Sequence, residues 1–363
     1  PATTKHDPDE VIARNGEERG ERINRAAAGG PAGVLALCRR HGIEAGGELN
    51  GVIVAAHTEA AAQRLERKAA DWRERQAPVD YLDRASAADV IGSTFFRGAL
   101  LDRRGGWINS LAYVRGLARA ATTAGAILHE NTRVSRVERS GGRWRVVTPT
   151  GTVVADAVAL CTNAHTDALW PGLSRTVVPV RLQQFVSRPL PPPARDTILP
   201  GRQPLTDTRR LIVGVRMHLD GRLQFNGTGP GFGPASPLPV EAARARISAI
   251  WPETRAMEIE TAWTGWVAMN REHGWKIHNP APGLYAALGC NGRGIVLATL
   301  IGMDLARRIL GVDERETVFP VSEAKPLRFH GLHRPVVRTM VAWYRARDRV
   351  ELAIRGNAGS GGT

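Results

Sequence analysis

The chain has 363 residues, 43% of them hydrophobic and 23% charged, an ordinary composition for a globular protein of about two domains. Its net charge of +14 comes mainly from arginines that are spread along the chain, which argues against direct nucleic-acid binding. No run of about 18 apolar residues occurs, and the first ten residues are polar and charged, so neither a transmembrane helix nor a secretory signal is expected.

The three cysteines are Cys38, Cys161 and Cys290. They are odd in number and far apart, so they predict neither a disulfide framework nor a metal site. A reducing cytoplasm is therefore the expected compartment.

Residues 8–44 are predicted to be helical, because acidic residues mix with arginines there and His41-Gly42 supplies a stop signal. A β-type run follows at 49–54. A second helix is predicted over 58–75, where Thr58 can cap the first turn.

A loop at 101–110 leads into a third predicted helix, which ends at Gly125. Short strands separated by glycine turns follow it, and the last of them is apolar and predicted to be buried. These predicted strands are 126–129, 134–138, 144–148, 152–155 and 157–161.

The second half of the chain begins as a β-rich region and ends with helices. Its predicted strands are 177–180, 184–186, 211–213, 223–225, 261–268 and 284–288. A Gly/Pro-rich loop is expected at 227–239, and the predicted helices are 239–250, 295–310 and 335–352.

The glycines at 289, 292 and 294 lie between an apolar strand and an apolar helix. Glycine lets the backbone approach a flat or anionic ligand closely, and a helix that begins there directs unpaired N–H groups toward it. The order is not the G-x-G-x-x-G of a Rossmann fingerprint. A tight strand-to-helix turn without a ligand is the alternative.

Other polar segments give weaker indications. Residues 161–165 end a predicted buried strand, where ligands of α/β sheets bind, but a simple Asx or Ser/Thr turn is the favoured local interpretation. His273 and His278 could be acid–base groups, although unplaced histidines are more often structural. No pattern of histidines, cysteines and carboxylates predicts a metal site.

In their order, these segments resemble the D-amino-acid oxidase/glycine oxidase (DAO) superfamily of FAD-dependent oxidoreductases, and most of all its γ-glutamylputrescine oxidase-like branch. The resemblance runs from about Pro8 to the C-terminal helix. The segments that carry it are 9–21, 41–43, 105–113, 116–120, 131–134, 161–164, Asp207, 220–223 and 289–294.

The resemblance implies FAD as the cofactor, with 133–134 near its adenine, 161–163 along the dinucleotide and 289–295 facing the flavin ring. The implied chemistry is hydride transfer to the flavin from a C–H bond beside nitrogen in an amine or amino acid, with O2 as the expected acceptor. The expected cofactor contacts are Arg133, Val134, Cys161, Thr162, Asn163, Gly289, Cys290, Asn291, Gly292, Arg293, Gly294 and Ile295. The expected catalytic residues are Trp107, Asn109 and Met269.

Two departures from the family pattern matter. The family opens with a strand, G-x-G-x-x-G and a helix, whereas this chain starts with Pro1 after that βαβ unit, so an N-terminally truncated protein is expected. Residues 266–274 lack the family's usual Asp and Pro, and Asn109-Ser110 stands where His-Pro is common in the branch. The identity of the substrate is therefore not carried over.

The expected fold is a mixed α/β protein, in which a Rossmann-like FAD domain without its first βαβ unit is interleaved with an antiparallel-sheet substrate domain. The expected segments are a helical 1–44, substrate-domain parts 45–104 and 176–280, FAD-domain parts 105–175 and 281–312, and a tail 313–363. Two alternatives stay open: a degenerate relative that binds no flavin, and a basic polyanion-binding protein.

Overall fold

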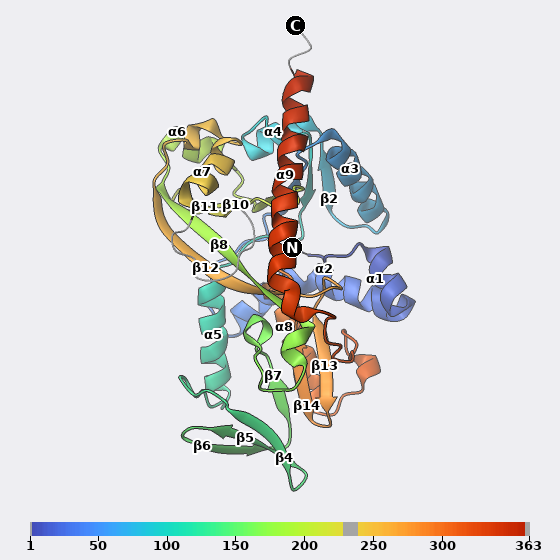
Figure 1. Cartoon of the computed structure of the whole chain (residues 1–363). Coiled ribbons are helices and arrows are strands. Elements are labelled where there is room, and N and C mark those ends of the chain that lie inside the picture. Colours follow the sequence, from blue (N-terminus) through green and yellow to red (C-terminus); the bar gives the residue numbers. More distant parts are fainter. Residues whose placement is uncertain (1, 228–238, 360–363) are drawn as a thin grey trace. The chain divides into compact units, whose positions relative to one another are not determined.

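The computed structural model describes residues 2–227 and 239–359, with side chains as far as residue 351. The chain folds into two compact units, each assembled from separate stretches (Figure 1). The first unit comprises Pro1–Gly47, Ile108–Val180 and Trp266–Gly331, and the second comprises Glu48–Trp107, Arg181–Gly265 and Leu332–Thr363. Most of the predicted Gly/Pro-rich loop, residues 228–238, lies outside the described residues.

The first unit contains two three-stranded sheets and several helices. Its helices are α1 (Pro8–Asn15), α2 (Glu17–Arg40), α5 (Ser110–Thr123) and α8 (Ile295–Ile309). One sheet has the order β4 (Arg136–Ser140), β5 (Arg143–Thr148) and β6 (Gly151–Ala155), and the other has the order β13 (Lys276–Ala281), β14 (Leu284–Leu288) and β7 (Val158–Leu160).

Strands β7 and β14 position residues 289–294, which form the glycine turn between β14 and α8. They pair in parallel, with Val158 opposite Leu284 and Leu160 opposite Ala286. Their carboxyl ends therefore lie at the same edge of the sheet, and the segments after Leu160 and Leu288 leave the sheet side by side.

Helices α2 and α8 of the first unit approach each other closely. A Cβ added to Gly30 of α2 would lie 2.2 Å from the Cγ1 atom of Val296 in α8, so only glycine fits at this crossing. Elsewhere in the unit, buried Trp144 packs edge-on against Trp170 and contributes to an apolar cluster with Leu284 and Leu288.

An eight-stranded sheet dominates the second unit. Its strand order is β12 (Ile259–Met269), β8 (Val178–Pro189), β11 (Arg222–Asn226), β10 (Gly214–Met217), β9 (Leu205–Asp207), β1 (Val52–Ala55), β3 (Ala99–Asp102) and β2 (Val79–Leu82). Residues 178–180 of its strand β8 and 266–269 of its strand β12 belong to the first unit. β1 and β9 pair in parallel, whereas β3 pairs antiparallel with β1 and β2, and β10 pairs antiparallel with β9 and β11. The helices of this unit are α3 (Glu59–Glu74), α4 (Arg84–Ile91), α6 (Pro192–Thr197), α7 (Val240–Ser248) and α9 (His333–Gly359).

Local sequence signals explain several of these elements. The hydroxyl of Thr58 accepts a hydrogen bond from the N–H of Ala61 and caps α3, as predicted. Asp83 caps α4 in the same way. The core of the second unit is apolar and tightly packed, with Phe185 stacked on Phe225 at 5.7 Å and Trp251 fully buried.

Two predicted strands are wrong. Residues 126–129 are irregular, and Ile127 and Leu128 are 80% and 53% exposed, so the apolar run has no sheet to join in the described chain. Residues 211–213 are also irregular and β10 begins only at Gly214, because two carboxylates accept the N–H groups that a strand would offer to a neighbour. Asp348 accepts from Leu211 at 3.3 Å, and Asp207 accepts from Val213 at 2.8 Å.

No helix within the described residues is long and apolar enough to cross a membrane. They also bring together no cluster of three or more His, Cys, Asp or Glu side chains that could hold a metal ion.

Candidate functional site

The glycine turn connects β14 to α8. Gly289, Asn291 and Gly292 have φ values of 87°, 47° and 78°, so the chain turns through the left-handed region three times in four residues. Gly289 has a second reason to be glycine, because an added Cβ would lie 2.3 Å from the amide nitrogen of Asn270. The turn is thus a specific, tightly constrained backbone shape.

Three asparagine side chains hold that shape. The Oδ1 atom of Asn163, just after β7, accepts hydrogen bonds from the N–H groups of Gly289 at 3.1 Å and Cys290 at 3.4 Å. Asn270 and Asn291 bond each other twice: the N–H of Asn270 donates to Oδ1 of Asn291, and Nδ2 of Asn291 donates to Oδ1 of Asn270, both at 3.1 Å. These bonds fix the turn without placing a charge in it.

The start of α8 offers free space and backbone donors. Gly294 is the N-cap residue of the helix, and no side chain caps its first turn. A Cβ added to Gly292 or Gly294 would meet no atom within 4 Å. Backbone N–H groups and the positive end of the helix dipole therefore face a space in which a flat or anionic group can lie.

The other expected cofactor contacts lie around the same edge of the sheet. Cys161, Thr162 and Asn163 follow β7, and the hydroxyls of Thr162 and Thr166 are 2.8 Å apart. The guanidinium of Arg133 forms an ion pair at 2.8 Å with Asp167 in the loop after β7. Val134 packs against the apolar cluster that contains the last residue of β7. The structure thus gathers all of the expected cofactor contacts in one unit.

The three expected catalytic residues are in different environments. Trp107 belongs to the second unit, where the guanidinium of Arg216 lies 4.1 Å from the centre of its ring. Asn109 belongs to the first unit, and its side chain caps α5 by accepting from the N–H of Ala112 at 3.1 Å. Met269 is the last residue of β12 and lies between Ala268 and Asn270. Both neighbours bond the glycine turn: the carbonyl of Ala268 accepts from the N–H of Asn291, and the N–H of Asn270 donates to the side chain of Asn291. Of the three, Met269 is the one placed beside the glycine turn.

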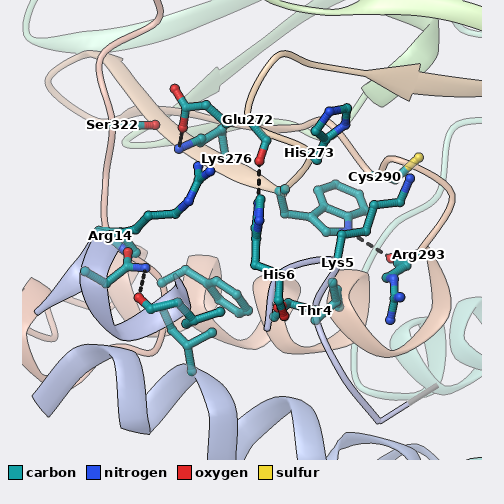
Figure 2. Close-up of a pocket in the computed structure, with 18 residues that line it drawn as sticks. Thr4, Lys5, His6, Arg14, Glu272, His273, Lys276, Cys290, Arg293 and Ser322 are labelled. Atoms are coloured by element: carbon teal, nitrogen blue, oxygen red, sulfur yellow. Dashed lines mark hydrogen bonds and ion pairs between the residues drawn. The ribbon is translucent and has the colours of Figure 1, made fainter. Parts of the chain in front are cut away.

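A cavity of about 250 Å³ lies next to the turn (Figure 2). Its wall includes Cys290 and Arg293 from the turn, the loop at 272–276, and residues 4–6 from the N-terminal stretch. Apolar side chains complete the wall: Val11, Ile23, Leu297 and Phe319.

More cationic than anionic side chains line this cavity. Burial, and then the proximity of Arg293, lower the pKa of the Lys5 ammonium from its ordinary value. Burial also lowers the pKa of His273, and the nearby charges of Lys5, His6 and Arg14 lower it further. The negative charges of Glu10 and Asp7 act in the opposite sense, on the pKa values of His273 and Arg293 respectively.

Sequence reasoning missed several residues of this region. Asn270 holds the turn through Asn291, although it lies in the segment that departs from the family pattern. Lys5 and His6 line the cavity although nothing in the N-terminal sequence marks them. His278 is 4% exposed and its Nδ1 donates to the carbonyl of Ser322 at 2.8 Å, a structural role consistent with the cautious interpretation of the lone histidines. A signal for Asn270 existed in the replacement of the family's usual residues, but its partner could not be inferred.

Comparisons with known proteins agree with this geometry. The sequence model of the DAO family, described as FAD dependent oxidoreductase, matches residues 9–308. The chain is 29% identical over 275 residues to "Probable oxidoreductase OrdL" of Rhizobium meliloti, covering 75% of this chain and 63% of that protein. It is 26% identical over 292 residues to the gamma-glutamylputrescine oxidoreductase of Escherichia coli, covering 79% of this chain and 68% of that protein.

Two further facts qualify these likenesses. The chain spans less than two thirds of the length of the OrdL proteins of Rhizobium meliloti and Haemophilus influenzae, at 63% and 55%. In three dimensions it is similar to the crystal structure of glycine oxidase from Geobacillus kaustophilus, with a TM-score of 0.73, 24% identity, and coverage of 90% of this chain and 86% of that one. The mixed α/β fold is therefore that of glycine oxidase.

Proposed function

Because this chain belongs to the DAO family of FAD-dependent oxidoreductases, we propose that it binds FAD at the glycine turn and oxidises a carbon–nitrogen bond of an amine or amino acid. The observation that carries the proposal is the open space at Gly292 and Gly294, beside the uncapped start of α8. We further propose that O2 is the electron acceptor and that the substrate is a γ-glutamylated amine or an amino acid. The names of the relatives support this choice.

The residues present fit the cofactor. Gly292 and Gly294 leave room for a flat ring system, and the first N–H groups of α8 are donors toward it. The strand end at 161–163 and the segment at 133–134 would hold the rest of the dinucleotide. When bound, FAD supplies the acceptor for the hydride of the C–H bond beside the substrate nitrogen.

The protein contributes positioning and charge stabilisation. The positive end of the α8 dipole stabilises negative charge that develops near Gly294. Asn163 and the pair of Asn270 and Asn291 keep the turn rigid, so that the N–H groups are already oriented before any ligand arrives. Apolar Met269 lies beside these amides at the end of β12.

A pair of glycine variants tests the proposal. Gly294 has φ of −80° and open space around its Cβ position, so Gly294→Val inserts a side chain into the proposed flavin space without backbone strain. Gly302→Val, on an exposed face of the same helix and also in open space, is the matched control. We expect the wild type and the control to acquire a flavin absorbance spectrum when FAD is added, and Gly294→Val to fail while its thermal unfolding is unchanged.

The same samples test the chemistry. Bleaching of the bound flavin under anaerobic conditions by γ-glutamylated amines or amino acids, with colour restored by O2, is the expected result. A wild-type chain that never retains FAD would refute the proposal for this chain and favour a relative without flavin binding.

A further inference from the structure

Helix α9 lies outside the part of the chain that matches the DAO family. The family model ends at residue 308, whereas α9 begins at His333 (Figure 1). Side chains of α9 are described as far as residue 351. The proposed flavin site uses none of them, so the flavin proposal gives this helix no role.

Two carboxylates hold α9 against the second unit. Asp348 accepts a hydrogen bond from the backbone N–H of Arg210 at 3.3 Å. Glu351 forms an ion pair with the guanidinium of Arg210 at 2.7 Å and lies 3.1 Å from Nε2 of His57. These are the only acidic residues among 333–351, and neither side chain is more than 23% exposed. The outward surface of this part of the helix therefore has almost no negative charge of its own.

Five arginines are exposed on the same stretch of helix. They are Arg334, Arg338, Arg345, Arg347 and Arg349. Arg347 pairs with Glu351 at 3.8 Å, and its guanidinium lies 5.6 Å from the centre of the Trp343 ring. Within the part of the chain whose side chains are described, Arg334, Arg338 and Arg349 form no ion pair. This uncompensated positive charge attracts an anionic partner, and the net charge of +14 adds to the attraction.

Exposed apolar side chains form a row along one flank of the helix. They are Val336 at 59%, Met340 at 40%, Trp343 at 53% and Val350 at 55% exposure. Their spacing in the sequence aligns them along the helix axis, and the row from 336 to 350 is about 21 Å long. A continuous apolar row of this length indicates an interaction surface, in contrast to apolar residues that are scattered singly.

The arrangement of the two kinds of side chain suits a flat partner. The packed side of α9 consists of the buried or half-buried positions 337, 341, 344 and 348. The apolar row lies one residue before these positions and most of the arginines lie one residue after them, so a turn of about 100° per residue places the two on opposite flanks. The outermost line between the flanks carries the small or uncharged side chains of Pro335, Thr339 and Ala346. A flat surface can therefore approach the helix closely and contact both flanks, because arginine side chains are long enough to reach it.

We propose that α9 binds to the surface of an anionic lipid bilayer, with the apolar row around Trp343 at the edge of the hydrocarbon and the arginines on lipid phosphates. Helices that lie in the bilayer interface combine an apolar row that includes Trp with a polar side rich in Lys or Arg. Such binding needs no membrane-spanning helix, and the described residues contain none. A second copy of α9 is a poor partner, because two sets of exposed arginines would repel each other. The inference goes beyond the proposed function, since no residue of the flavin site takes part.

Flotation of the whole chain with lipid vesicles tests this surface. One set of vesicles contains phosphatidylcholine alone, and the other also contains anionic phosphatidylglycerol. We expect the chain to float with the anionic vesicles, less so as the salt concentration rises, and not with the neutral ones. Arg338→Gln combined with Arg349→Gln should weaken binding about 30-fold, since each cation near an anionic surface contributes about 5-fold. Trp343→Gln should weaken binding by about 5-fold or more.

Matched controls come from the same unit. Arg64→Gln combined with Arg67→Gln removes the same charge from exposed positions of α3. Leu219→Gln is the control for Trp343→Gln, because Leu219 is 63% exposed. Arg338→Lys combined with Arg349→Lys keeps the charge and is expected to bind. Thermal unfolding shows whether each variant is folded.

Several results would overturn the inference. Equal flotation with neutral and anionic vesicles would do so, as would α9 variants that bind like the wild type. A loss of binding in the α3 control as large as that in α9 would assign the effect to net charge alone. Tighter binding of polyglutamate than of vesicles, abolished by the α9 changes, would assign the helix to an acidic protein. A parallel FAD titration separates this test from that of the flavin proposal, which predicts unchanged FAD binding in all of these variants.

Discussion

The acceptor at Asn163 gives the sharpest test of how the glycine turn is held. Asn163→Ala removes the oxygen that accepts from the N–H groups of Gly289 and Cys290, both of which are buried. A buried donor left without a partner costs about 1–3 kcal/mol. The bond to Cys290 is long at 3.4 Å and Asn163 is only half-buried, so water can replace part of the loss. We therefore expect about 2 kcal/mol for the pair.

Thermal unfolding and FAD titration measure the two consequences. A loss of about 2 kcal/mol lowers the unfolding temperature of a domain of about 150–250 residues by roughly 4–8 °C. FAD affinity is expected to fall as well, because the turn loses its fixed shape. Asn163→Asp keeps an acceptor oxygen and is expected to retain most of the stability.

Asn226→Ala is the matched control, since Oδ1 of Asn226 accepts from the N–H of Gly214 at 2.5 Å in the second unit. It is expected to lower stability without changing FAD affinity. If Asn163→Ala unfolds like the wild type, or loses stability with FAD binding intact, our account of the turn is refuted.

Three further changes give distinct results. Gly289→Ala places a methyl group at a residue with φ of 87° and directs it toward the amide of Asn270. The free energy of unfolding, measured with urea, should fall by at least ~1–2 kcal/mol. An unchanged urea midpoint would show that the turn can relax. Burial holds the pKa of His278 below its ordinary value. As the pH falls, the unfolded chain therefore takes up a proton at this residue at a higher pH than the folded chain does. Stability is then full above about pH 6.5 and falls as the pH drops below it, and His278→Gln should flatten this decline in urea midpoints measured against pH. Asp348→Ala leaves the N–H groups of residues 210–211 unpaired and should cost about 1–3 kcal/mol without affecting FAD binding, as thermal unfolding and FAD titration will show.

The sequence predicted best those elements whose signals are local. The cap at Thr58, the strand β14 and the helix α8 all depend on residues within a few positions of one another, and all three are present. The predicted strand at 211–213 failed for the opposite reason. Its N–H groups bond carboxylates that include Asp348, which is 137 residues from Leu211 in the chain, and no local pattern reports such a partner.

The same distinction holds for the candidate site. The spacing of the glycines between a strand and a helix predicted a tight turn at residues 289–294, and the positive φ values there confirm it. The groups that hold it could not be paired from the sequence, because Asn163 lies 126 residues before Gly289. The cavity was beyond prediction, since it joins the N-terminal stretch around Lys5 to a loop and a turn more than 260 residues away.

The chemistry of the turn explains why asparagines hold it. An aspartate at any of the positions 163, 270 or 291 could accept the backbone N–H groups that bond there, but its negative charge would compensate the positive end of α8. It could not replace the Nδ2 group of Asn291, which donates to the carbonyl of Gly289 at 2.7 Å. Asparagine side chains supply acceptors and donors with no net charge, and Gly294 leaves the first N–H groups of the helix uncapped. The positive potential at this helix end is thus retained for a ligand. A positive helix end with oriented N–H groups would stabilise the negatively charged reduced form of the flavin that we propose to bind here.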